Sequence, residues 1–255
     1  MATGVLPVCF GQATRIIEYL LNCTKTYVAL IELGTTTDTF DREGKITSRR
    51  DTTGISISRV TNVLQDFQGN IQQVPPIYSA LKLNGKKYYE LARAGIPLEP
   101  PPRQVNIESI EILSFEIPLL ELRVRCSKGT YIRSLANDVG GKLSCGAYLR
   151  DLVRTAYGPF NLDCALSINQ IEATIRQGAL DSVLYPADFP ILQWPSVDLN
   201  SEQTQSIIHG HDITLPLTNT YGITLYRVYD TQGKFLAVVK FMPQSNLWHP
   251  VKVFI

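Results

Sequence analysis

The chain of 255 residues is 44% hydrophobic and 18% charged, which is typical of a folded globular protein and argues against a disordered or fibrous one. It contains no apolar run near the roughly 18 residues that a membrane-spanning helix needs, and its start shows no secretory signal pattern. Its five cysteines form no CxxC pair, so we expect no Cys/His metal site, but small buried thiols in a reducing, cytoplasmic compartment.

The formal net charge of +1 is unevenly spread along the chain. Residues 1–160 carry 19 Lys/Arg against 15 Asp/Glu, and residues 161–255 carry 5 against 8. The excess of positive charge in the first part permits a polyanionic partner there. A solvated surface explains the same asymmetry equally well.

The first part of the chain alternates between apolar segments and polar turns. Residues 13–21 predict a helix that packs on a sheet, because four apolar residues fall on one side of it. Residues 27–33 (YVALIEL) predict a buried strand, and residues 35–45 a polar loop. Residues 58–67 predict a helix with Ser58 as its N-cap. The apolar side of the first helix consists of Ile16, Ile17, Leu20 and Leu21.

Residues 74–103 form a basic insert with prolines at both ends and a helical middle. Such a segment is more natural as a projecting arm than as a core element. Its positive charges are Lys82, Lys86, Lys87, Arg93 and Arg103.

Two strands and a helix are expected after this insert. Residues 105–113 and 119–126 predict the strands, the second with a clean alternation of apolar and charged side chains. The turn at residues 127–129 leads into the helix. Residues 165–178 predict a further helix, and residues 223–255 predict a small β unit with its own core. The buried face expected for the first of these helices consists of Ile132, Leu135, Ala136, Val139 and Leu143.

The junction CSKGTYIR combines a strand end and a helix start with Lys128, Tyr131 and Arg133. Backbone N–H groups at a helix start, with cations nearby, suit a phosphate. A tyrosine beside an arginine can also stack on a base and clamp a carboxylate or phosphate. On these residues alone, a capping turn with surface Lys and Arg is the simpler interpretation.

Four segments resemble the TruB-type pseudouridine synthases, in that family's order and spacing over about residues 1–160. CSKGTYIRSLANDVGGKLSCGAYLRDLVRT is similar to their strand, active-site turn and helix. VPPIYSALKLNGKKYYELARAG looks like the RNA-gripping thumb insert of the bacterial members. KTYVALIELGTTTDTFDREG resembles their strand and loop with an active-site tyrosine and aspartate. MATGVLPVCFGQATRIIEYL matches the segment after the catalytic aspartate in the pattern GHxGxLDPxATGxLP.

The resemblance implies roles for five residues of a uridine pocket. Tyr27 matches the tyrosine that stacks on the flipped-out base, and Tyr131 and Leu152 match further residues of the pocket lining. Arg133 matches the arginine that pairs with the catalytic aspartate, and Asp41 matches a second aspartate in its network. Taken one at a time, several of these residues have plainer interpretations: a core tyrosine, an Asx-turn aspartate and a buried leucine.

The resemblance also implies that cations of the insert contact RNA phosphates, which gives affinity with little sequence information. Without the resemblance, these cations are typical of a solvated face. The residues concerned, together with Lys128 of the turn, are Lys82, Lys86, Lys87 and Arg93.

The chain departs from the family pattern at the catalytic nucleophile, the aspartate of the LDP motif. The residue after that motif aligns with Met1, which places the aspartate two positions before the first residue of this chain. Asp38 and Asp41 already match other family positions. An internal methionine taken as the start is the first explanation, and a truncated, inactive gene is the second.

We therefore expect an α+β fold: a mixed, mostly antiparallel sheet flanked by helices, with a small C-terminal β domain. Residues 1–190 are expected to form the pseudouridine synthase domain, and residues 191–255 a PUA-like domain. The implied reaction converts the T-loop uridine of tRNA (uridine-55) to pseudouridine without a cofactor. The implied protein is a cytoplasmic, bacterial monomer that binds the tRNA T-arm and no membrane. The alternatives are a non-catalytic tRNA-binding or tRNA-folding protein and a guide-RNA-dependent relative, against which the GKKYYELARAG segment argues.

Overall fold

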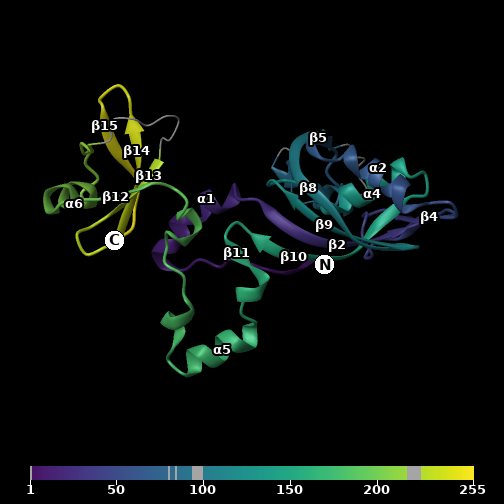
Figure 1. Cartoon of the computed structure of the whole chain (residues 1–255), viewed down its shortest axis with the longest axis horizontal. Helices are drawn as coiled ribbons and strands as arrows, with labels where there is room; N and C mark the ends of the chain where they lie inside the picture. The colour runs from purple at the N-terminus through teal and green to yellow at the C-terminus, as the bar shows by residue number, and fades with distance from the viewer. Residues whose placement is uncertain (1, 80, 84, 94–99, 217–224) are drawn as a thin grey trace. The chain divides into compact units, whose positions relative to one another are not determined.

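The computed structural model describes residues 2–79, 81–83, 85–93, 100–216 and 225–255. It divides into two compact units (Figure 1). The first unit comprises Met1–Leu6 and Asn22–Ala165, and the second comprises Pro7–Leu21 and Leu166–Ile255. That residues 1–190 and 191–255 act as the two functional domains stays a prediction.

A seven-stranded sheet forms the centre of the first unit. The strands are β1 (Ala2–Gly4), β2 (Lys25–Leu33), β5 (Gly69–Gln73), β8 (Arg103–Glu116), β9 (Leu119–Cys126), β10 (Ala147–Tyr157) and β11 (Phe160–Asn161). They lie in the order β1–β10–β2–β9–β8–β5, with β11 paired to β10. Neighbouring strands are antiparallel except β1 and β10, which confirms the expected mixed, mostly antiparallel sheet.

Strand β9 shows how the sequence gives this sheet one buried face. Successive side chains of a strand point to opposite faces, so an alternating sequence separates apolar from charged residues. Arg123 and Arg125 lie on the exposed face, where they pair with glutamates of β8. The predicted alternation is confirmed by the fully buried residues Leu120, Leu122, Val124 and Cys126.

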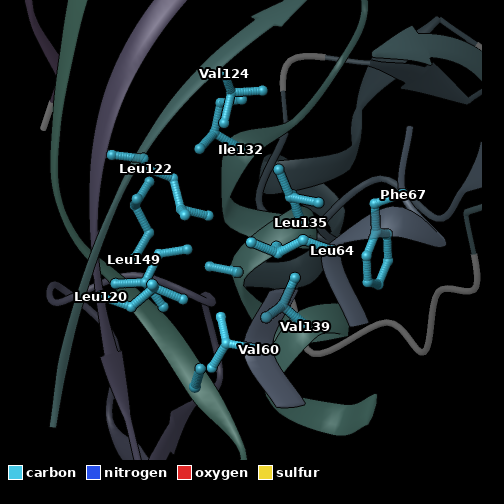
Figure 2. Packing of buried hydrophobic residues seen from close by; sticks show 14 of the residues in the cluster. Val60, Leu64, Phe67, Leu120, Leu122, Val124, Ile132, Leu135, Val139 and Leu149 are labelled. Carbon is cyan, nitrogen blue, oxygen red and sulfur yellow. The ribbon is translucent and has the colours of Figure 1, made fainter. Parts of the chain in front are cut away.

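Two helices, α2 (Ile57–Gln65) and α4 (Ile132–Lys142), cover the buried face of the sheet. In Figure 2, Leu135 and Val139 of α4 point toward the sheet residues, and Val60 and Leu64 of α2 belong to the same cluster. Burying one such side chain contributes roughly 1.5–3 kcal/mol. The buried face expected for α4 is therefore confirmed.

The N-cap of α2 is Ser56, so the expected cap at Ser58 is wrong. An N-cap residue needs non-helical backbone and a side-chain oxygen that accepts an N–H from the first turn. Ser56 has extended backbone, with φ −102° and ψ 159°, and its hydroxyl accepts a hydrogen bond from the Arg59 amide. Ser58 already lies inside the first turn, because the helix starts at Ile57, three residues before its first buried residue, Val60.

Strand β10 has no counterpart among the expected elements, although it lies between β1 and β2 in the sheet. Its register against β2 shifts between Leu149 and Asp151 and again between Arg154 and Ala156. Such irregularities break the two-residue period that identifies a strand in a sequence. Pairing with both neighbours, rather than a local pattern, fixes this segment as a strand.

Helix α4 approaches the start of β10 closely at one glycine. A Cβ atom added to Gly140 would lie 2.2 Å from the backbone nitrogen of Ala147. The next helix residue, Gly141, has open space around it. Packing of α4 on β10 therefore requires glycine at position 140 but not at position 141.

The basic insert contains a short hairpin and a helix. Strands β6 (Lys82–Leu83) and β7 (Lys86–Lys87) pair in antiparallel fashion, and helix α3 (Tyr88–Arg93) follows them. The expected helical middle is present, and Tyr88 is buried. Residues 80, 84 and 94–99 lie outside the described residues, and the projecting arm stays a prediction.

The second unit begins with the segment expected to be an amphipathic helix. A 3₁₀ turn (Gly11–Ile16) leads into the short helix α1 (Ile17–Leu21). Ile16 and Leu20 are buried, but Ile17 and Leu21 are 42% and 54% exposed. The prediction that all four residues share one buried side is therefore wrong. Residues four apart lie on the same line along a helix, so Ile16 and Leu20 are buried together, while Ile17 and Leu21 lie on the adjacent, exposed line.

A four-stranded sheet confirms the small C-terminal β unit. Its strands, in spatial order, are β12 (Ser196–Asp198), β13 (Leu225–Tyr229), β14 (Phe235–Met242) and β15 (Leu247–Val253). Helix α6 (Ser201–Ile208) contributes Ile207 to the core, which is centred on the buried Trp248. Residues 223–224 of the expected first strand lie outside the described residues.

The helix expected at residues 165–178 is α5 (Ile168–Arg176). It begins with a capping box in which the Ser167 hydroxyl accepts the Gln170 amide N–H and the Gln170 side chain accepts the Ser167 N–H. Shorter 3₁₀ turns flank it at Leu162–Cys164, Leu180–Val183 and Phe189–Ile191.

We predict that Gly140→Ala lowers the free energy of unfolding by about 1–3 kcal/mol, because the added methyl group forces α4 away from β10. Gly141→Ala, one residue further along the same helix, should leave that free energy unchanged or raise it by up to about 1 kcal/mol. Urea unfolding of both variants measures the difference. Equal stabilities would contradict the close packing at Gly140.

Candidate active site

One cavity in the first unit is lined by four of the five residues assigned to a uridine pocket. Its volume of about 380 Å³ is in the range of small-molecule pockets. Tyr27, Tyr131, Arg133 and Leu152 line it, and Asp41 lies next to it, bonded to Arg133. The other lining residues are Ala2, Thr3, Gly4, Leu6, Thr130, Ile132 and Arg154.

The register of three adjacent strands builds one wall of the cavity. Arg154 of β10 lies opposite Tyr27 of β2 on one side and opposite Gly4 of β1 on the other. Paired residues on neighbouring strands project to the same face, so the guanidinium and the phenol ring are neighbours. Gly4 has φ +101°, and a Cβ there would lie 2.2 Å from the Arg154 carbonyl oxygen, so only glycine fits.

Arg133, the second residue of α4, forms the charged centre of the site. Its Nη1 donates to Asp41 Oδ2 at 2.9 Å and to the carbonyl of Thr39 at 3.4 Å. Its Nη2 donates to the carbonyl of Tyr78 at 2.8 Å. The side chains of Arg133 and Asp41 are only 25% and 17% exposed, so each charge depends on the other to offset lost hydration.

The Asp41 carboxylate is fixed by its own loop, which connects strands β3 (Thr35–Thr37) and β4 (Ile46–Arg49). It accepts the Thr39 hydroxyl at 2.6 Å and the Glu43 amide at 3.1 Å. The bond to the amide two residues later is an Asx turn, so Asp41 has this local role as well as its ion pair. The loop backbone also pairs with Leu149 of β10.

Tyr27 presents its ring to the cavity from the centre of the sheet. Burial raises the pKa of its hydroxyl, and its hydrogen-bonding neighbour Arg154 opposes this shift only in part. The phenol is therefore neutral at physiological pH and keeps an uncharged aromatic face. Such a face is suited to stacking on a nucleobase.

Arg154 is a cavity residue that the sequence analysis does not single out. Its Nε donates to the carbonyl of Val5 at 2.7 Å, and its guanidinium lies 5.1 Å from the ring centroid of Tyr157. It thus joins β1 to β10 and supports Tyr27. The irregular strand β10 contains a second arginine, Arg150, so no local sequence signal distinguishes Arg154.

Lys128 lies at the turn before α4 but does not line the cavity; its Nζ donates to Asn22 Oδ1 at 2.7 Å. A positive field is nevertheless present at this end of the sheet. Burial lowers the pKa of Lys25; the nearby thiols of Cys23 and Cys126 oppose this shift, and the cations Arg154 and Lys128 add to it. This field suits a polyanion.

Four of the five cations of the insert fall in short elements of the backbone. Lys82 lies in β6, Lys86 and Lys87 form β7, and Arg93 ends α3. Their side chains lie outside the described part of the structure, so their contacts with RNA stay a prediction.

The described residues were also compared with the requirements of a metal site and of a membrane-spanning helix. Among them, no three His, Cys, Asp or Glu side chains form a group that could hold a metal ion. In the same part of the chain, no helix combines the length and the apolar character required to span a bilayer.

Comparison with known families assigns most of the chain. Residues 1–132 match the model of the N-terminal domain of TruB family pseudouridylate synthases. Residues 133–191 match that of the tRNA pseudouridylate synthase B C-terminal domain.

Curated relatives extend the match along the chain. A tRNA pseudouridine synthase B of Dehalococcoides mccartyi is 46% identical over 255 residues, which is 100% of this chain and 84% of the relative. A tRNA pseudouridine synthase B of Pseudomonas aeruginosa is 42% identical over 241 residues, which is 93% of this chain and 78% of the relative.

Solved structures share the fold at low identity. A chain of an H/ACA RNP bound to a substrate RNA containing 2'-deoxyuridine gives a TM-score of 0.72 at 22% identity, covering 100% of this chain and 73% of that one. A chain of a Cbf5-Nop10-Gar1 complex gives a TM-score of 0.72 at 24% identity, with the same coverage. The chain belongs to the TruB family of pseudouridine synthases, isomerases that form pseudouridine in tRNA.

Proposed function

We propose that the cavity accepts the T-loop uridine of tRNA (uridine-55), extruded from its loop, and that the protein converts it to pseudouridine. The observation that carries this proposal is the meeting of Tyr27, Tyr131, Arg133 and Leu152 around one cavity, with Asp41 paired to Arg133. These residues come from separate parts of the chain. Their convergence supports a built nucleotide site rather than chance surface features.

The proposed roles follow from the chemistry of each side chain. Extruding a base from its stack costs a few kcal/mol, which contacts to the extruded base must offset. The Tyr27 ring stacks on one face of the uracil, while Leu152 and Tyr131 complete its pocket. Arg133 holds the reacting carboxylate ionised, because an opposite charge within about 4–6 Å lowers the pKa of a carboxyl group.

The reaction conserves all atoms of the uridine. The bond between N1 of uracil and C1′ of ribose breaks, the base rotates, and a bond between C5 and C1′ forms. C5 loses its proton and N1 gains one. The family pattern places the nucleophilic aspartate two positions before Met1, so we propose that a carboxylate at that position reacts in this cavity.

We further propose that the protein acts in the cytoplasm as a monomer on tRNA alone, without a guide RNA. The relatives named tRNA pseudouridine synthase B are 46% and 42% identical, whereas the H/ACA structures are below 25% and support the fold alone. Lys82, Lys86, Lys87, Arg93 and Lys128 then contact phosphates, and the shape of the tRNA arm provides specificity.

The proposal is tested with tRNA that lacks pseudouridine, incubated with this chain and with a longer chain extended upstream by its natural codons. Mass spectrometry then locates any pseudouridine formed. We expect both chains to bind tRNA and the longer chain to modify the T-loop uridine. Pseudouridine elsewhere, binding without any turnover, or a requirement for added guide RNA would each refute part of the proposal.

In the longer chain, Arg133→Ala should reduce turnover at saturating tRNA by at least about 100-fold, because it removes a charge that acts on the reacting carboxylate. Binding of tRNA should change little. Arg123→Ala, which removes an exposed arginine paired with Glu111, is the control and should retain normal turnover. Weaker binding with normal saturated turnover in Arg133→Ala would show that the role is misassigned.

In the longer chain, Tyr27→Ala should lower the single-turnover rate constant by about 5–150-fold, because base stacking contributes roughly 1–3 kcal/mol. Tyr27→Phe keeps the ring and loses only the hydroxyl, so its turnover should lie much nearer to that of the wild type. Single-turnover assays of both variants provide the comparison. Similar losses in the two variants would argue that the hydroxyl, and not the ring face, matters.

A further inference from the structure

A buried glutamine lies where the basic insert leaves the sheet. Gln73 is the last residue of β5 and is only 2% exposed. Its Nε2 donates to the carbonyl of Tyr131 at 3.0 Å, and its Oε1 accepts the amide N–H of the same residue at 2.8 Å. One side-chain amide therefore satisfies both backbone groups of a single residue of the cavity wall.

This pairing closes the start of α4. The first N–H groups of a helix have no partner within the helix and are normally satisfied by a capping side chain. Tyr131 is the N-cap residue, and its own side chain makes no capping hydrogen bond. Gln73, which is 58 residues earlier in the chain, fixes the cap residue instead.

The same turn of α4 also binds the first residues of the insert. The Ser134 hydroxyl, 1% exposed, donates to the carbonyl of Val74 at 2.7 Å. Arg133 donates to the carbonyl of Tyr78. The root of the insert and the wall of the cavity therefore form one hydrogen-bonded unit, with Gln73 at its buried end.

We propose that Gln73 is a positioning residue for pseudouridine formation. By holding the Tyr131 backbone, it fixes the start of α4, and with it the place of Tyr131 and Arg133 in the cavity. It also links the insert that is expected to contact tRNA to the residues expected to contact the base. This inference rests on the proposed function for the roles of Tyr131 and Arg133.

Two substitutions in the longer chain, extended upstream, test the hydrogen bonds, with an exposed neighbour as control. Gln73→Met keeps the length of the side chain and removes both bonds, so the turnover number should fall at least about 10-fold while KM for tRNA changes less than about 3-fold. Gln72→Met changes the exposed residue beside it in β5 and should behave as the wild type.

Gln73→Glu adds a pH readout that a general loss of stability would not produce. An ionised Glu carboxylate faces the Tyr131 carbonyl oxygen and is repelled by it. A protonated one donates to that oxygen and accepts the Tyr131 N–H, as glutamine does. Turnover of Gln73→Glu relative to the wild type should therefore rise as pH falls from about 8 to about 6, since burial raises the pKa of such a carboxyl.

Turnover is measured as total pseudouridine in tRNA, so the result does not depend on which uridine reacts. Hydrogen exchange at the amide of Tyr131, measured on the chain without RNA, is the second readout. Faster exchange with reduced turnover number in Gln73→Met supports the proposal. Unchanged exchange in Gln73→Met, or faster exchange with normal turnover, overturns it. Modification only outside the T loop refutes the proposed function and leaves the role of Gln73 standing.

Discussion

The ion pair between Arg133 and Asp41 is the contact on which the site depends. Both side chains are mostly shielded from water, so removing either one would leave an isolated charge in a poorly hydrated place. The guanidinium also bonds the carbonyl groups of Thr39 and Tyr78. A single side chain thus holds together the start of α4, the loop between β3 and β4 and the root of the basic insert.

Around this pair, the site combines residues on central strands with residues at a helix start. Tyr27 and Arg154 lie side by side on adjacent central strands, where the sheet hydrogen bonds on both sides fix their positions. Arg133 and Tyr131 stand at a helix start that Gln73 caps from another element. An aromatic ring on strands and a charged group on a capped helix are both preorganised, which is what the proposed recognition of an extruded base requires.

The same fold occurs in chains of H/ACA assemblies that share only 22–24% of the sequence. A shared fold does not by itself assign a partner, so this likeness supports the architecture alone. In the present chain the sheet and the start of α4 supply the cavity, and the cations Lys25, Lys128 and Arg154 lie close to one another.

The sequence by itself determined the parts with a regular local pattern: the alternation of β9, the apolar face of α4, and the strand-to-helix junction that contains Tyr131 and Arg133. It also placed Tyr27 on a strand and Asp41 in a loop, and the resemblance named them as one site. Tertiary structure alone decided β10, the position of Arg154 and the cap by Gln73. Bulges hide the period of β10, and Gln73 acts across 58 residues of chain, so neither leaves a local signal.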